Sequence, residues 1–192
     1  MWTSAWTCPE HGEVLPFLPA PEPSADWVRH VCSLATVPVW LPWPLPDGWV
    51  VSSVAPVGTE VTGLRAVAVV LGGPHPLGGA AELMLLSEEP GTGLAGRLAG
   101  LVGTDPGSVV DGPPYTHVSV AGHPVPLWLV PSDDDHAVVV GERDLSWLWL
   151  LVRPASAGAL LVDDLRVTDA RTMGEEVRLL PYGARSDWPD AP

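Results

Sequence analysis

Cys8 and His11 are the residues near the start of the chain that best fit a chemical site, because they form a Cys-x-x-His motif. A thiolate and an imidazole at this spacing can bind one tetrahedral zinc ion, but structural zinc needs four protein ligands. His30 and Cys32 could supply the other two, although His-x-Cys is an unusual spacing for structural zinc. The alternative is a metal-free arm and a buried Cys32.

The segment from Val37 to Trp49 contains three tryptophans and four prolines in thirteen residues. Its prolines exclude a helix, since each lacks an amide proton and restricts the residue before it. Trp40, Trp43 and Trp49 are therefore candidate binding residues on an extended segment, as a groove or a docking surface. The alternative is that they cover a sheet as core residues, which we expect at least of Trp49, because it opens a strand after a Pro-Asp-Gly turn.

Other motifs predict no catalytic residue. The glycine-rich loop around His75 lacks the Gly-Lys-Ser/Thr ending of a phosphate-binding loop, and the chain has no lysine at all. The run Asp133 to His136 is typical of a solvated loop, although its carboxylates could bind a divalent cation. Neither the cysteines nor the histidines lie in a nucleophile motif. His75 and His123 remain candidates for the polar group of a ligand site.

The charge balance excludes some partners. The chain has 23 acidic residues and 9 basic ones, all of them arginine, for a net charge of −14. Nucleic acids and anionic membranes attract a basic face, so we expect neither as a partner. The longest apolar run, Leu145 to Val152, is too short to span a bilayer. A cytoplasmic protein is therefore expected, with another protein as its partner and an oligomeric state that the sequence leaves open.

The elements that must position these residues are mostly strands. Hydrophobic alternation and β-branched residues predict seven of them: Trp49–Ala55, Arg65–Leu71, Leu83–Ser87, His117–Val120, Pro124–Val130, Ala137–Glu142 and Leu145–Val152. A short helix is predicted within Gly91–Leu101, and Gly158–Ala170 fits either a helix or a strand. The predicted fold is α+β and mostly β: an antiparallel sheet with one or two short helices. Residues 1–26 are expected to form an irregular proline-rich arm, residues 27–184 a single domain, and residues 185–192 a flexible tail.

The chain resembles the actinobacterial family of unknown function DUF6758, over nearly its whole length from Trp2 to Ser186. The matching segments are Trp2 to Gly12, Val37 to Pro46, Gly73 to Gly79, Pro126 to Trp128, Trp147 to Trp149 and Leu179 to Ala184. The resemblance implies no activity. It does imply a Cys-Pro-x-Cys pair upstream of Cys8, which would complete a zinc site with Cys8 and His11. The given sequence begins at Met1 without that pair, so zinc is expected as a cofactor only if the protein extends further upstream, and the arm is expected to be the remnant of a zinc knuckle.

Two functional hypotheses follow. The first is a non-catalytic interaction or regulatory domain. The second is a small-ligand-binding protein or enzyme with a tryptophan-lined pocket, in which His75 or His123 supplies the polar group. A deep pocket with one of these histidines beside a carboxylate would favour the second hypothesis, and a convex aromatic surface would favour the first.

Overall fold

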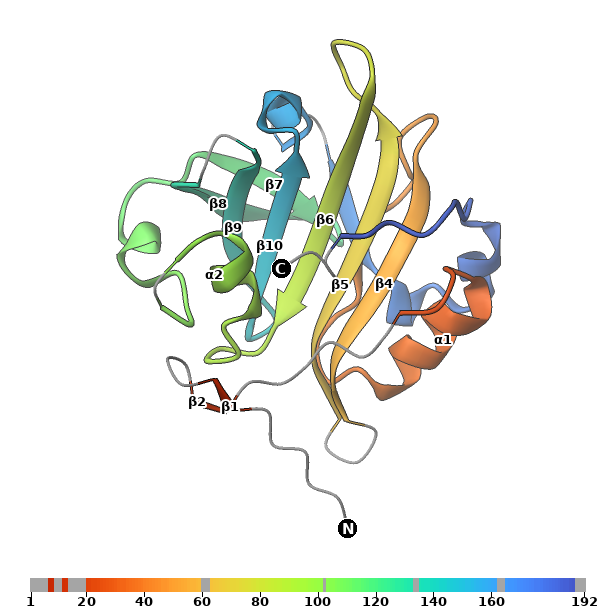
Figure 1. Ribbon diagram of the computed structural model, residues 1–192, viewed down its shortest axis with the longest axis horizontal. Coiled ribbons are helices and arrows are strands. Elements are labelled where there is room, and N and C mark those ends of the chain that lie inside the picture. Colours follow the sequence, from red (N-terminus) through yellow and green to blue (C-terminus); the bar gives the residue numbers. More distant parts are fainter. Residues whose placement is uncertain are drawn as a thin grey trace.

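Strands rich in valine and leucine are the main secondary-structure elements of the protein (Figure 1). The computed structural model describes residues 7–8, 12–13, 20–59, 63–101, 103–132, 135–161 and 165–188. Its strands are β1 (Thr7–Cys8), β2 (Gly12–Glu13), β3 (Trp40–Pro42), β4 (Val50–Thr59), β5 (Gly63–Pro74), β6 (Ala80–Glu88), β7 (Thr116–Val120), β8 (His123–Val130), β9 (Ala137–Arg143), β10 (Ser146–Arg153) and β11 (Arg166–Asp169). Its helices are α1 (Ala25–Leu34) and α2 (Leu94–Leu98), with 3-10 helices η1 (Gly107–Asp111), η2 (Ala155–Leu161), η3 (Ala170–Thr172) and η4 (Gly174–Leu179).

Nine of the described strands form one sheet, in the order β3-β11-β7-β8-β9-β10-β6-β5-β4. Its neighbouring strands are antiparallel except for β11 and β7, which are parallel. The prediction of an antiparallel sheet is therefore wrong in one respect, because the sheet is mixed. Since β9 and β6 already occupy both edges of β10, the chain crosses over through η2, and β11 pairs with β7 instead.

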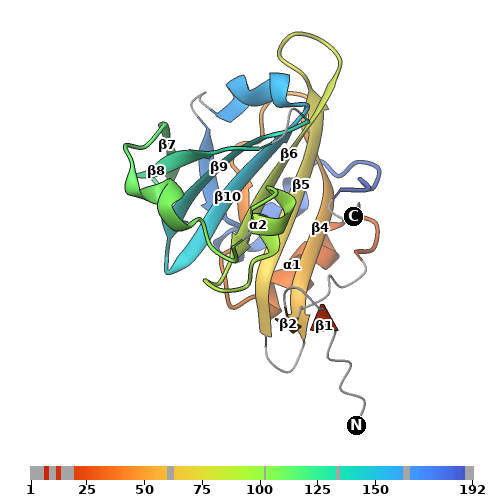
Figure 2. The ribbon, with the colours of Figure 1, turned by 60° about the vertical axis from the view of Figure 1, so that its left-hand side comes forward.

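The sheet curls, so that β3 at one end of the strand order comes back into contact with β6. Figure 2 shows the strands fanning out as the sheet turns. Both faces of the central strands are buried. In β6, Leu83 and Leu85 face one apolar cluster with α1, whereas Met84 and Leu86 face a second cluster with α2. This alternation is the period of two that a strand imposes on its side chains.

The predicted strands are all present, and most extend a few residues further than predicted. The exceptions are the starts of β4 and β10, because Trp49 and Leu145 belong to the preceding turns rather than to the strands. The predicted helix within Gly91–Leu101 shortens to α2. The ambiguous Gly158–Ala170 is divided between two structures: η2 ends at Leu161, and β11 begins at Arg166.

Sequence patterns did not reveal helix α1. Ser24 caps it by accepting a hydrogen bond from the Trp27 amide at 3.2 Å, and Asp26 lies in its first turn, where a negative charge is favourable. The helix buries Val28 and Val31 against the sheet. The expected boundary between arm and domain at residues 26 and 27 thus falls inside α1. Of residues 1–19, the structure describes only the short antiparallel pair of β1 and β2.

The outer edge of β4 is covered by later and earlier parts of the chain. Val51 donates its amide to the Pro181 carbonyl at 2.9 Å, and the Gly183 amide donates to the Val51 carbonyl at 3.0 Å. Further along the strand, the Trp27 indole donates to the Val54 carbonyl at 2.8 Å. The tail that was expected to be flexible from residue 185 is packed as far as Trp188, which is buried.

Among the described residues, no helix has both the length and the apolar character needed to cross a membrane.

Candidate functional site

The tryptophans of the proline-rich segment are mostly core residues. Trp40 and Trp49 are only 2% and 4% exposed, and both belong to the cluster that contacts α1. Trp43 is half-buried against the same cluster. Trp40 therefore packs in the core and does not line the pocket described below. Trp49 packs in the core and also lines that pocket.

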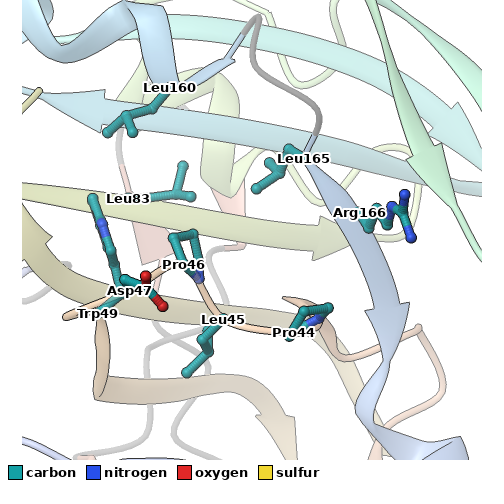
Figure 3. Close-up of a pocket in the computed structure, with 9 residues that line it drawn as sticks. All are labelled: Pro44, Leu45, Pro46, Asp47, Trp49, Leu83, Leu160, Leu165 and Arg166. Atoms are coloured by element: carbon teal, nitrogen blue, oxygen red, sulfur yellow. The ribbon is translucent and has the colours of Figure 1, made fainter.

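A pocket of about 470 Å³ opens between this segment and the curled sheet (Figure 3). Four structures contribute its walls: the segment after β3, strand β6, helix η2 and the start of β11. Its lining residues are Pro44, Leu45, Pro46, Asp47, Trp49, Leu83, Leu160, Leu165 and Arg166. Figure 3 shows Pro46, Leu83, Leu160 and Leu165 around its middle, so this part of the pocket is apolar.

Local sequence explains the near wall of the pocket. The prolines keep the segment extended. The chain then reverses in a Pro-Asp-Gly-Trp turn, in which the Trp49 amide donates to the Pro46 carbonyl at 3.1 Å and Gly48 takes a φ of 78°. A glycine with positive φ at the third position is the requirement of a type II turn. The turn brings Pro46 and Trp49 to the same side of the cavity.

The pocket has one charged residue of each sign. Figure 3 places Asp47 beside Trp49, and Arg166 at the other end of the pocket. Arg166 is held next to the proline-rich segment by the backbone, because its carbonyl accepts a hydrogen bond from the Trp43 amide at 2.9 Å. Both charged side chains are on exposed residues.

His75 does not line this pocket. It lies in the turn between β5 and β6, where its Nδ1 accepts a hydrogen bond from the Leu77 amide at 2.9 Å. An amide can only donate, so the proton of a neutral imidazole is on Nε2 and points to the Ser156 hydroxyl at 3.0 Å. His75 therefore ties the turn to η2. His123 begins β8, exposed and likewise outside the pocket lining.

The metal prediction falls mainly outside the described residues. His11 is one of the residues that the structure does not describe, and of Cys8 only the backbone in β1 is described. Cys32 is a half-buried free thiol. Burial, and secondarily the charge of Asp169, raise the pKa of that thiol to about 12, despite the opposing effect of Arg171. The described residues contain no group of three or more His, Cys, Asp or Glu side chains able to hold a metal ion.

Glu88 is a buried carboxyl that the sequence analysis missed. It is fully buried at the end of β6, and its Oε2 accepts hydrogen bonds from the Leu94 and Ala95 amides of α2 at 2.8 and 3.3 Å. Its Oε1 makes no hydrogen bond of good geometry with the described residues, but the Trp149 indole is near enough to favour the ionised carboxyl slightly. Burial raises the pKa of Glu88 to about 7, against the lowering effect of the two amides. No sequence motif signals this site, because an acidic residue at the end of a strand is normally solvated.

A second cavity, of about 680 Å³, lies beneath the segment that covers β4. Its floor is made of the small residues Gly72, Gly73, Ala80 and Ala81. The polar groups at its rim bind one another: Glu82 pairs with Arg153 and accepts a hydrogen bond from Ser186. The Arg153 guanidinium also lies 4.7 Å from the centroid of the Trp188 ring. These contacts fasten residues 184–188 to the sheet.

Comparison with known proteins identifies a family. The model of a family described as "Family of unknown function (DUF6758)" matches residues 1–188. No curated protein and no solved structure matches the chain.

Proposed function

Since the chain belongs to the DUF6758 family, a family of unknown function, we propose a function from its structure: a non-catalytic binding domain whose pocket of about 470 Å³ holds the apolar part of a small organic ligand. The observation that carries this proposal is the apolar middle of the pocket, between the proline-rich segment and η2. Ligand pockets are typically concave, mostly apolar and roughly 300–1,000 Å³ in volume, with few polar groups.

The composition of the lining supports binding rather than catalysis. Among the described residues, its lining includes no histidine, cysteine, serine or threonine, and its charged members are Asp47 and Arg166. General acid–base or nucleophilic chemistry needs a suitable group within hydrogen-bond reach of the ligand. Asp47 is the described lining residue of that kind, and it is exposed at one end of the pocket, away from the apolar middle. His75, the polar group expected of an enzyme, lies outside the pocket. This combines the non-catalytic domain of the first hypothesis with the tryptophan-walled pocket of the second.

The cytoplasmic location expected from the sequence is part of this proposal. What supports it is the free thiol of Cys32, which is compatible with a reducing compartment.

The test uses N-phenyl-1-naphthylamine, an uncharged apolar dye whose fluorescence rises in apolar surroundings. We expect saturable binding to the wild-type protein with a stoichiometry of one. Leu160→Glu places a charge in the apolar wall and should weaken binding about tenfold or more, because burying an unpaired carboxylate is costly. The matched control is Leu179→Glu, at a leucine that is 72% exposed and outside the pocket.

Circular dichroism and thermal melting of both variants show whether each is folded, so that lost binding is read only from a folded protein. Absence of saturable dye binding to the wild-type protein would refute the proposal. Equal affinities of wild type and folded Leu160→Glu would show that the dye binds elsewhere, and would refute the assignment of this pocket.

A further inference from the structure

We infer that the ligand of this pocket carries a carboxylate on an apolar body, and that Arg166 binds the carboxylate. This inference rests on the proposed function of the pocket. It is carried by three observations: the apolar middle of the pocket, the position of Arg166 at one end, and the absence of a described ion pair or side-chain hydrogen bond for that arginine.

Arg166 differs from the other arginines of this acidic protein. Six of the nine arginines form ion pairs with carboxylates: Arg29, Arg65, Arg143, Arg153, Arg171 and Arg178. Arg97 donates to the Gly93 carbonyl, and Arg185 also has an interaction partner. Within the described part of the chain, Arg166 makes neither an ion pair nor a side-chain hydrogen bond. Its guanidinium is therefore available to a ligand, beside a pocket.

The lack of an ion pair at Arg166 among the described residues is unusual because the protein has an excess of carboxylates. The chain has 23 acidic residues, so an exposed arginine has many potential partners. Strand β11 instead holds Arg166 at the pocket, where the Trp43 amide binds its carbonyl. A guanidinium stays charged at every accessible pH and presents paired N–H groups that match the two oxygens of a carboxylate.

Asp47 fixes the orientation of such a ligand. It lies at the Trp49 end of the pocket, away from Arg166 (Figure 3). A carboxylate at that end would meet a like charge, whereas at the other end it meets an opposite charge. The apolar body then lies between the two ends, against Pro46, Leu83 and Leu165. A cationic amphiphile would bind in the opposite orientation, with its charged head group at Asp47.

The experiment compares three probes that differ only in the head group: decanoate, decanol and decylammonium. Each is titrated by calorimetry below its aggregation concentration, at pH 7.5 and low salt. We expect decanoate to bind about five- to tenfold more tightly than decanol, a modest preference because the arginine is exposed. Arg166→Gln should remove the preference without changing decanol affinity, and Arg166→Lys should keep part of it.

The matched control is Arg178→Gln, which removes the same charge at an exposed arginine outside the pocket and should leave the preference unchanged. If decanol and decanoate bind the wild type equally, the proposed pocket stands and the carboxylate inference is wrong. Preferred binding of decylammonium overturns the inference in the same way. If none of the three probes binds, both the inference and the proposed function fail.

Discussion

The indole ring of Trp49 lies flat against the backbone of Gly73, so closely that a β-carbon at Gly73 would lie 2.3 Å from the Trp49 Cδ2 atom. No side chain larger than hydrogen fits there unless the ring moves. Gly73 is on β5 and Trp49 precedes β4, its neighbour in the sheet. Trp49 can therefore take its place in the pocket wall only because residue 73 of β5 is a glycine.

We expect Gly73→Ala to displace Trp49 and to lower the free energy of unfolding by about 1–3 kcal/mol, the usual cost of overpacking. Trp49→Ala should cost about 3–5 kcal/mol, because Trp49 is 4% exposed. The double variant should be more stable than the sum of the two losses predicts, since the methyl group fills space that the ring has left. Urea denaturation measures all three.

Gly112→Ala is the control for this series, because nothing lies within 4 Å of a β-carbon at Gly112 and its φ is −88°. It should be close to neutral. Strict additivity of Gly73→Ala and Trp49→Ala would contradict the contact between the two residues.

Glu88 should make stability fall as the pH rises from about 4.5 to about 7. Its pKa is raised from an ordinary 4.5 to about 7 in the folded protein. Between these values the folded protein holds a proton that the unfolded chain releases, so the neutral carboxyl stabilises the fold at low pH and this stabilisation is lost as the pH passes 7. A shift of this size corresponds to about 3 kcal/mol.

The measurement is urea denaturation of wild type and Glu88→Gln at pH 5 and pH 8. The wild type should lose stability relative to the variant between the two pH values. Glu142→Gln, at an exposed position of β9, serves as the control and should follow the wild type. A constant difference between wild type and Glu88→Gln at both pH values would show that the carboxyl is ionised throughout.

Leu145→Gly should stabilise the protein by about 1 kcal/mol. The two residues of the β9–β10 turn, Asp144 and Leu145, have φ values of 54° and 61°, the geometry of a type I′ hairpin that favours glycine. A leucine is strained in this region, and its side chain is 85% exposed, so little packing is lost. Leu179→Gly, at an exposed leucine of η4, should instead destabilise. A lower melting temperature for Leu145→Gly would refute the expected relief of strain.

Cys32 should react slowly with electrophiles. The thiolate is the reactive form, and burial together with Asp169 raises the pKa of Cys32 to about 12. At pH 8, in a Cys8→Ser background, we expect iodoacetamide to alkylate the folded protein at least about a hundredfold more slowly than the urea-unfolded chain. Mass spectrometry over time gives both rates. Similar rates in the two states would mean that the thiol is open to solvent and readily ionised.

Much of the fold was predictable because its strands are short apolar segments between turn residues. Leu83 to Leu86 and Leu148 to Val152 are continuous apolar runs of four and five residues, which is the pattern of strands buried on both faces. Strand order was not predictable in this way. The parallel pairing of β11 with β7 depends on which edges remain unoccupied after the hairpins have formed, and no local pattern encodes that. Helix α1 was missed because it follows prolines and has only two fully buried positions, Val28 and Val31.

The site was predictable in part. The composition of the segment from Val37 to Trp49 marked it as unusual, and five of its residues line the pocket: Pro44, Leu45, Pro46, Asp47 and Trp49. The opposing wall comes from Leu160, Leu165 and Arg166, more than 100 residues later in the sequence. These are ordinary residues individually, and only the curl of the sheet brings them to the proline-rich segment. His75 was selected for its chemistry, but its hydrogen bonds are used within the fold.

Pairings between distant parts of the sequence have a consequence for how the protein is made. Strand β3 pairs with β11, and the outer edge of β4 is completed by Pro181 and Gly183. Both ends of the strand order thus consist of segments that leave the ribosome early and pair with segments that leave it late. The intervening β5 and β6 can form hairpins during synthesis, whereas the β3 border cannot close until translation has passed Asp169, and the β4 border cannot close until it has passed Gly183. Since such non-local contacts are slow to form, we expect folding to finish after synthesis and to be slow for a chain of this size.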